Sequence, residues 1–530
     1  MSKRNFHIGC GVIIALHILL ILFYGIQKQG FHEDEYYTYW SSAGYADLSP
    51  SGYQWRSGYD IQSQFFVRKD NRFAFDEVIQ NQVEDVHPPL YYLTLNVLMS
   101  FMAGSFYKWF GILLNLLFSI ITLTGILFLF SRLDRGRNRY WFALLAGAVY
   151  AFAPSTVSNV MITRMYAMST MWTVIYACIL MDLYRNGECS KGKFAVITFS
   201  GAVVCYLSFL THYFCLLEAF FLTLLYTFYI FAVKRKGVIR LIIYGASMVA
   251  AIGLAVWSFP ASLQHIFHGY RGEGAISGLL HTGLFERTKV FLPYINKNIF
   301  AGMLVPAALL TIVSLIFLIA LCMRRNRTKT DLYMGAYIIL LTATVMSFYI
   351  LTKTALMVGD GSCRYFFPVT SLLLPLMAYG IAKATSILAG YNKGKAVQVL
   401  NGVALFLIMI PVLVGHTKGN ILFLYPEEVE KVAFSVENQE YPLIMIYDRE
   451  KAYRSWYTVD QLWPFQKIFY ADYDHLMLDF EDETLMNAEK VIVYMDCPED
   501  VLEKLLEKNT HLSTYTLARH DPFFYIYVLE

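Results

Sequence analysis

The most constraining feature of this sequence is a series of apolar runs of about 20 residues each, the length that a helix needs to cross a bilayer. The first run, Ile8–Ile26, contains no charged residue. Only Glu218 and Arg240 interrupt the later runs with charge. These runs are Trp109–Phe130, Trp141–Val160, Met165–Met181, Phe194–Leu210, Tyr213–Val233, Val238–Ser258, Phe300–Met323, Leu332–Thr352, Tyr365–Ala382 and Ala396–Gly415. The sequence therefore predicts an α-helical polytopic membrane protein.

The composition of the 530 residues supports this class. Hydrophobic residues make up 57% and charged residues 16%, whereas soluble globular chains contain about 25% charged residues. The net charge of +3 gives no electrostatic reason to expect nucleic-acid binding. No P-loop, GxGxxG, HExxH or CxxC motif stands out, which argues against common soluble nucleotide and metal chemistries.

The stretch Pro88–Tyr107 is also uncharged, and whether it crosses decides the topology. If it does not cross, the strongly basic loops at 132–139, 234–236 and 324–329 all face the cytoplasm together with the N-terminus. We therefore predict about 11 crossings, a cytoplasmic N-terminus and an extracytoplasmic C-terminus, as the positive-inside rule requires. Pro88–Tyr107 is then expected to lie on the outer face or to re-enter it as a juxtamembrane segment.

The chain is expected to divide after the last span. Residues 1–415 form the membrane domain, with outer loops at 27–108 and 259–299, and residues 416–530 form an extracytoplasmic domain. In this tail, strand-like runs alternate with helix-like runs, which predicts a small α/β domain. The expected strands are Leu443–Tyr447, Lys467–Tyr470, Val491–Tyr494 and a hairpin of Ser513–Ala518 with Phe523–Val528; the expected helices are Glu427–Val436, Val459–Phe465 and Pro498–Lys508. No glycine-rich phosphate loop follows these strands, so we expect a docking or acceptor-handling module.

Two local motifs could carry chemistry. The first is Phe31-His32-Glu33-Asp34-Glu35-Tyr36-Tyr37, directly after the first span. It is either a solvated acidic loop with Asp34 as the N-cap of the next helix, or a general base with an orienting neighbour. The second is Glu84-Asp85-Val86-His87-Pro88-Pro89-Leu90-Tyr91-Tyr92. It is either a proline break with interfacial tyrosines, or a shelf on which His87 contacts an anion.

Together these motifs resemble the polytopic GT-C glycosyltransferases, in the branch of the protein O-mannosyltransferases and aminoarabinose transferases. In that branch an Asp-Glu pair follows the first span and an H-P-P-L-Y-Y-like stretch closes the first outer loop. Three weaker matches follow in order: Arg164-Met165-Tyr166-Ala167, Thr211-His212-Tyr213-Phe214 and Arg364-Tyr365-Phe366-Phe367-Pro368. The resemblance covers roughly residues 1–415, and all three matches fall on the outer face in the topology derived from charge.

The resemblance implies that a sugar is transferred from a polyprenyl-phosphate donor to an extracytoplasmic acceptor with inversion. Asp34 corresponds to the base, with Glu35 as its helper or substitute. The phosphate candidates are His87, Arg164, His212 and Arg364, of which the arginines are preferred because they bind phosphate bidentately. Tyr91, Tyr166 and Tyr365 are expected along the path of the sugar or carrier.

No cofactor is expected, although relatives differ in metal use and a divalent metal stays open. The cationic side chains favour the metal-free version. The expected partners are the lipid-linked donor, membrane lipids, and a protein, lipid or polysaccharide acceptor; the expected location is the cell membrane. The main alternative is a polytopic lipid or solute transporter or flippase, for which charged or broken helices are expected near the middle of the membrane. A structural or sensory protein is a third alternative.

Overall fold

The computed structural model describes residues 1–45, 54–134, 138–185, 189–229, 237–324, 330–391, 395–472, 483–496 and 512–530, together with residues 136, 502, 503 and 506. The chain folds into two compact units. Unit 1 comprises Met1–Ile26, Gln82–Tyr91 and Gly111–Phe423, and unit 2 comprises Gln27–Asn81, Tyr92–Phe110 and Leu424–Glu530.

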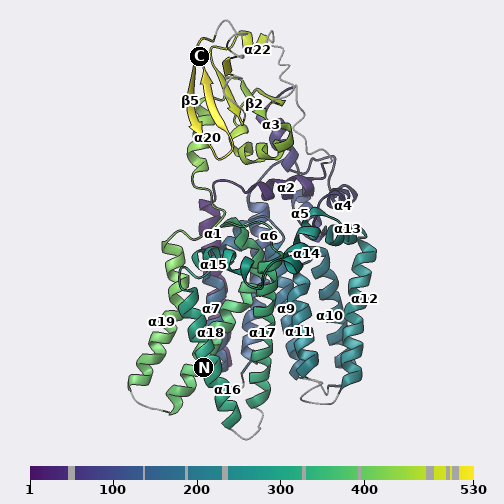
Figure 1. Ribbon diagram of the computed structural model, residues 1–530, viewed down its shortest axis with the longest axis vertical. Coiled ribbons are helices and arrows are strands. Elements are labelled where there is room, and N and C mark those ends of the chain that lie inside the picture. The colour runs from purple at the N-terminus through teal and green to yellow at the C-terminus, as the bar shows by residue number, and fades with distance from the viewer. Residues whose placement is uncertain are drawn as a thin grey trace. The chain divides into compact units, whose positions relative to one another are not determined.

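The long apolar helices follow the predicted spans (Figure 1). They are α1 (Lys3–Gln27), α6 (Trp109–Arg132), α7 (Arg139–Phe152), α8 (Pro154–Met161), α9 (Tyr166–Arg185), α10 (Lys191–Thr211), α11 (Cys215–Tyr229), α12 (Val238–Ser258), α16 (Leu304–Arg324), α17 (Thr330–Thr354), α18 (Phe367–Tyr391) and α19 (Lys395–Thr417). Among the described residues, 8 helices are long and apolar enough to cross a membrane, or up to 9 if each bent pair counts as one span. The chain is therefore a multi-pass membrane protein. The predicted total of crossings and the orientation of the termini stay predictions.

The helices of unit 1 bury some faces against each other and leave others apolar and exposed. α18 packs against α7, α9, α16, α17 and α19, and α10 packs against α9 and α12. On the outside of the bundle, Trp257 is 78% exposed and Ile239 is 75% exposed. Exposing such apolar faces to water would cost free energy, so we expect lipid to cover them.

One predicted span is broken. The run Trp141–Val160 forms α7 and α8, which meet at a bend of 50°. Pro154 is the first residue of α8 and has no N–H to continue the ladder of α7. Ala153 before it adopts an extended conformation (φ −64°, ψ 134°), as a residue before proline prefers.

Between the long helices lie shorter elements: α13 (Ala261–Phe267), α14 (Tyr270–His281), α15 (Glu286–Asn298) and the 3₁₀ helix η3 (Gly361–Phe366). The uncharged stretch Pro88–Tyr107 forms α5 (Leu90–Phe101), a helix of 12 residues. At 1.5 Å per residue this helix is about 18 Å long and too short to cross a bilayer, as the prediction of a non-crossing segment requires.

Unit 2 contains a six-stranded mixed sheet, seen in Figure 1 with α20 (Glu428–Glu437) beside it. The strand order is β1-β3-β2-β4-β6-β5, with β1 (Trp55–Arg56), β2 (Leu443–Tyr447), β3 (Ile468–Asp472), β4 (Val491–Met495), β5 (Tyr515–His520) and β6 (Tyr525–Leu529). β2 pairs in parallel with β3 and β4, and β6 pairs antiparallel with β4 and β5. The predicted α/β class of the tail is confirmed.

The sheet has a feature that the sequence did not predict, because β1 comes from the first loop and pairs antiparallel with β3 of the tail. The other described elements of unit 2 are α2 (Glu33–Ala43), α3 (Gly58–Gln62), η1 (Ser63–Phe65), most of α4 (Phe75–Glu84), most of α5 (Leu90–Phe101), η4 (Arg449–Thr458), α21 (Val459–Leu462) and α22 (Glu483–Met486). The predicted helix Pro498–Lys508 falls largely outside the described residues.

Candidate functional site

The first part of the candidate site is the segment of residues 29–37, which we call the acid turn; it lies in unit 2. α2 begins here at Glu33, and its N-cap is His32, whose Nδ1 accepts a hydrogen bond from the backbone N–H of Asp34 at 3.1 Å. The side chain of Glu35 closes a capping box by accepting from the backbone N–H of His32 at 2.9 Å. Asp34 is therefore in the first turn and is not the cap.

The two adjacent acids, Asp34 and Glu35, have opposite environments. The Glu35 side chain is 0% exposed, and its Oε2 lies 2.9 Å from Nζ of Lys28, which is also 0% exposed. The Asp34 side chain keeps 19% of its surface exposed. Consecutive residues of a helix point about 100° apart, so one carboxylate is directed inward and the other is directed toward the surface. Asp34 is thus the member of the pair that a substrate can reach.

A metal ion has one candidate position in the described part of unit 2. Donor atoms of His32, Glu33 and Asp34 lie within 4.8 Å of one another. However, Nδ1 of His32 already accepts the capping hydrogen bond from Asp34. A metal at this nitrogen would cost the N-cap of α2, which is worth about 1 kcal/mol. A metal at this nitrogen would therefore compete with the cap, and the steps proposed below are carried by the side chains of this chain.

The second part of the candidate site lies in unit 1 and consists of Asp85, His87, Arg164 and His212, which we call the His87–Arg164 cluster. Nδ1 of His87 lies 2.8 Å from Oδ2 of Asp85. Nε2 of His87 lies 3.3 Å from Nη2 of Arg164, and the His87 and His212 rings are 6.1 Å apart. Three residues predicted from separate motifs are thus brought together.

The electrostatics of this cluster follow from its neighbours. Burial alone would raise the pKa of the Asp85 carboxyl, but His87 and Arg164 beside it outweigh burial and hold that pKa at about 2. Burial, followed by His87 and Arg164, holds the pKa of His212 well below its usual value. His212 is therefore a neutral hydrogen-bonding group at neutral pH. Arg164, which is 4% exposed, carries a permanent positive charge in this cluster.

Tyr91 supports the loop that carries Arg164 through a chain of two hydrogen bonds. The Tyr91 hydroxyl donates to Oδ1 of Asn115 at 2.9 Å, and Nδ2 of Asn115 donates to the carbonyl of Ile162 at 2.7 Å. Ile162 is two residues before Arg164. Tyr91 is 0% exposed, so in this conformation it supports the loop of Arg164 and presents no surface to a substrate path.

Tyr166, Tyr365 and Arg364 extend the cluster. The Tyr166 ring lies 5.8 Å from the His212 ring and 6.0 Å from the Tyr365 ring. The Arg364 guanidinium lies 4.9 Å from the Tyr365 ring centroid, and its Nη1 donates to the carbonyl of Gly361 at 2.9 Å. Unit 1 therefore joins two buried arginines and two histidines through a pair of tyrosines.

A small cavity lies beside these tyrosines, with room for about one water molecule. Tyr166, His212, Tyr365 and Glu218 are among its lining residues. Glu218 is 2% exposed, and its Oε1 accepts a hydrogen bond from Thr344 at 2.9 Å. This intramembrane acid was noted in the sequence but was not assigned to the site.

Sequence reasoning assigned no role to three residues that shape these two parts: Asp85, Lys28 and Asp460. Asp85 stands two residues before His87, a spacing that could have suggested a partner for the imidazole. Lys28 and Asp460 carry no local signal, because their partners are brought to them by tertiary folding. Asp34 and Glu35 belong to one unit and the phosphate candidates to the other, so their convergence in one pocket stays a prediction.

Comparison with known proteins places the fold. No protein-family model matches the chain, and no curated protein matches its sequence. Among solved structures, ArnT from Cupriavidus metallidurans bound to undecaprenyl phosphate is 12% identical, with a TM-score of 0.50 over 99% of this chain and 98% of that chain. The apo structure of ArnT gives a TM-score of 0.48. The apo oligosaccharyltransferase of Archaeoglobus fulgidus is 10% identical, with a TM-score of 0.44 over 84% of this chain and 64% of that chain.

At this level of identity the likeness to ArnT concerns the fold. It extends over nearly the whole of both chains, including the tail that the sequence motifs did not cover. The resemblance to the GT-C glycosyltransferases is therefore confirmed as a likeness of fold, with helices of membrane length and a C-terminal mixed sheet.

Proposed function

We propose that this protein is an integral membrane glycosyltransferase that transfers a sugar from a polyprenyl-phosphate carrier to a hydroxyl of an extracytoplasmic acceptor. The observation that carries the proposal is the likeness of fold, over 99% of the chain, to ArnT bound to undecaprenyl phosphate. The polar groups of the two parts of the candidate site supply what such a reaction requires. These are an accessible carboxylate for the acceptor and buried cations for the phosphate.

Asp34 is the proposed base. In a single displacement, the acceptor oxygen attacks the anomeric carbon while its proton passes to the Asp34 carboxylate. The bond between the anomeric carbon and the phosphate oxygen breaks, and its electron pair leaves with the carrier phosphate. One displacement inverts the configuration at the anomeric carbon. The partial exposure of Asp34, compared with the buried ion pair of Glu35, supports this choice.

Arg164 and Arg364 are the proposed phosphate ligands. Negative charge grows on the phosphate as the bond breaks, and buried guanidinium groups stabilise it more than exposed ones would. Arg164 is 4% exposed and Arg364 is 6% exposed. His87 orients Arg164 through the contact of 3.3 Å. Nδ1 of neutral His212 accepts from the Phe214 N–H at 3.1 Å, so its Nε2–H can donate a hydrogen bond near the leaving group.

The isoprenoid chain of the donor requires an apolar groove. Unit 1 contains a cavity of about 100 Å³ whose lining residues are all apolar and include Ala153, Ile299, Phe300 and Met303. Asn298, next to this lining, donates to Oδ1 of Asp360 at 2.7 Å, which is four residues before Arg364. We place the carrier tail in this cavity because it lies beside the segment that holds a phosphate ligand.

The proposal is tested with purified full-length protein in lipid nanodiscs, a panel of polyprenyl-phosphate sugars, and an assay for release of the carrier phosphate. We expect release with at least one sugar. Asp34→Asn should reduce the rate by about 10²- to 10⁴-fold, the range for loss of a general base. The matched control is Asp70→Asn, because Asp70 is an acid in the same outer loop whose side chain is 81% exposed.

Two outcomes would contradict the proposal. If Asp34→Asn and the control Asp70→Asn both release the carrier at the wild-type rate, Asp34 is not the base. If no donor in the panel releases its carrier but labelled lipid moves between leaflets, the protein is a flippase. Orientation is checked separately by labelling cysteines introduced near each terminus from the two sides of the membrane.

A further inference from the structure

We propose that the C-terminal domain acts as a clamp on the acid turn, with Asp460 as the positioning residue that holds the turn so that Asp34 can serve as base. This inference rests on the proposed function. It gives the tail a role in the reaction without assigning it a second catalytic centre. All of the residues involved belong to unit 2.

The backbone of the acid turn is held directly by the tail. The N–H of Gln29 donates to the carbonyl of Leu424 at 2.7 Å, and the N–H of Phe31 donates to Oδ2 of Asp460 at 3.3 Å. These two bonds lie only two residues apart and fix the path of the chain into α2. Because the turn precedes α2, it would otherwise present its N–H groups to water.

Side chains reinforce the same contact. The Tyr37 ring stacks on Trp456 with centroids 4.6 Å apart, and the Tyr36 ring meets Trp463 edge to face at 6.1 Å. Burial and then the Asp460 carboxylate hold the pKa of the buried Tyr36 hydroxyl well above its usual value. Two consecutive aromatic residues of α2 thus lie against tail residues 456–463.

At Gly30 the backbone of the acid turn lies very close to tail residues Tyr425 and Glu428. A Cβ added at Gly30 would lie 2.6 Å from Cγ of Glu428 and 3.0 Å from Cβ of Tyr425. Tyr425 itself has a φ of 51°, a left-handed conformation that is rare for a residue other than glycine. Such a conformation persists only where the surroundings determine it. The segment 424–428 is therefore shaped to fit the acid turn.

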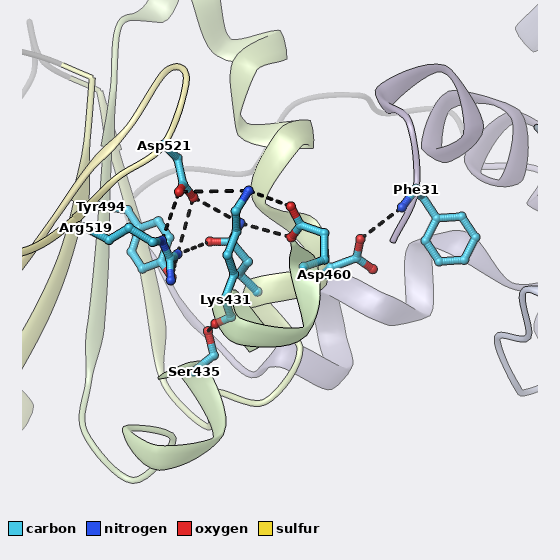
Figure 2. A network of polar contacts seen from close by, with 9 residues as sticks. Phe31, Lys431, Ser435, Asp460, Tyr494, Arg519 and Asp521 are labelled. Carbon is cyan, nitrogen blue, oxygen red and sulfur yellow. Dashed lines mark hydrogen bonds and ion pairs between the residues drawn. The ribbon is translucent and has the colours of Figure 1, made fainter. Parts of the chain in front are cut away.

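Figure 2 shows the contact between Phe31 and Asp460 beside a network of polar contacts that includes Arg519 and Asp521. Gln461 is 0% exposed; its Nε2 donates to Oε2 of Glu428 at 3.3 Å and to Oδ2 of Asp521 at 3.2 Å. Its Oε1 accepts from Arg519 at 2.7 Å. α21 therefore presents Gln461 to this buried polar network and Asp460 to Phe31. A network in which each group is bonded restricts the position of the carboxylate.

The acid turn has an internal brace as well, the ion pair of Lys28 with Glu35. These interactions hold residues on both sides of Asp34 in the sequence. Glu35 is held by its ion pair with Lys28, and Phe31 is held by its hydrogen bond to Asp460. Asp34 lies between them with its carboxylate partly exposed. A shift of the turn by about 1 Å can cost on the order of 100-fold in rate when a catalytic group loses its alignment. The clamp is therefore expected to affect turnover more than binding.

The decisive comparison is Asp460→Ala against Asp460→Asn. Asparagine retains an oxygen that accepts the Phe31 N–H, whereas alanine does not. We expect Asp460→Ala to lower kcat by about 10- to 100-fold with little change in donor KM, and Asp460→Asn to stay within about threefold of the wild type. The control is Glu430→Ala, which removes an exposed acid from α20 of the same domain.

A second measurement does not depend on activity. Hydrogen exchange of the intact protein should show faster exchange at the Phe31 amide in Asp460→Ala, with β2 and β4 as protected as in the wild type. Asp460→Asn and Glu430→Ala should show wild-type protection. If no donor is turned over, the proposed function fails, and the exchange experiment still decides whether the clamp exists.

A variant on the other side of the contact covers the case in which Asp460→Ala does not fold. Gly30→Ala introduces a Cβ that must push Glu428 and Tyr425 away, and we expect the same loss of kcat and of Phe31 protection. The inference is overturned if Asp460→Ala or Gly30→Ala leaves both kcat and Phe31 protection at wild-type values, or if kcat falls equally in Asp460→Asn. Equal loss would mean that the charge of Asp460, and not its hydrogen bond, is required.

Discussion

Replacing Glu35 by Gln separates a structural role of this acid from a catalytic one. Glutamine can still close the capping box by accepting from His32, but Lys28 then remains charged and buried without its carboxylate. Removing one partner of a buried pair costs about 3–5 kcal/mol. The rings of Phe31 and Tyr425, 5.1 and 5.6 Å from the Lys28 ammonium, return about 0.5–2 kcal/mol through cation–π attraction.

The net expectation for Glu35→Gln is a loss of about 1–4.5 kcal/mol in the free energy of unfolding. The double variant Lys28→Met/Glu35→Gln removes both charges and keeps a side chain of similar length at residue 28. Because replacing a whole buried pair by uncharged groups is often nearly neutral, the double variant should recover most of that loss. Denaturant unfolding in nanodiscs, followed by intrinsic fluorescence, measures both values, and carrier release measures activity in the same samples.

A structural Glu35 predicts that stability and activity return together in the double variant. If stability returns while activity stays absent, Glu35 takes part in the reaction as the helper that the motif suggested. If the double variant is as unstable as Glu35→Gln, the reasoning from the buried pair is wrong. Asp34→Asn serves as the comparison, because it should remove activity without changing the unfolding transition.

Other predictions follow from the same contacts. Arg364→Ala should raise the KM for the donor by about 10-fold or more, because a buried charge-assisted bond is worth about 1.5–3 kcal/mol; an equal effect on the acceptor KM would argue against a phosphate role. Asp85→Asn should weaken donor binding through loss of the orientation of His87 and Arg164. His87 and Arg164 hold the pKa of Asp85 at about 2. The stability that Asp85 contributes is therefore present above about pH 4 and is lost as the pH falls toward 2. In a plot of melting temperature against pH, Asp85→Asn should reduce the fall between about pH 4 and pH 2. Burial, with a further contribution from Glu428, raises the pKa of Asp460 to about 7. Because the folded protein then holds this proton more tightly than the unfolded chain, the wild type should lose stability relative to Asp460→Asn as the pH rises from about 4 to 7. A constant difference between the two melting temperatures over this range would refute the prediction.

The membrane bundle could be predicted because the signal for each span is local. A run of about 20 apolar residues specifies a helix wherever it lies, and α10, α12 and α16 follow their predicted runs closely. The break between α7 and α8 was missed although Pro154 stands inside the run, because hydropathy alone does not register a missing N–H. In the tail, β2 occupies the predicted residues Leu443–Tyr447, since a short buried strand is a continuous apolar run.

The candidate site was less predictable because its partners are distant in sequence. The motifs indicated His87, Arg164 and His212, but the distances of 3.3 Å and 6.1 Å within the cluster depend on loops from three parts of the chain. The resemblance of the H-P-P-L-Y-Y stretch predicts that Tyr91 lies along the path of the sugar or carrier, and that role stays a prediction. The structure buries it against Asn115, and no local pattern separates these two roles.

The division of labour between Asp34 and Glu35 depends on where the helix begins. If Asp34 were the N-cap, its carboxylate would be occupied by the N–H groups of the first turn and would be a poorer base. Because His32 takes the cap, through its Nδ1 and the Asp34 N–H, the Asp34 carboxylate does not serve as the cap; its Oδ2 lies 3.7 Å from Nδ1 of His32, while Glu35 closes the capping box. A His32→Ala variant should therefore affect Asp34 indirectly, by freeing the first turn of α2 to take a different cap. We expect reduced carrier release in His32→Ala and partial recovery in His32→Asn, since asparagine is a strong N-cap; equal activity in both would mean that the cap does not control the base.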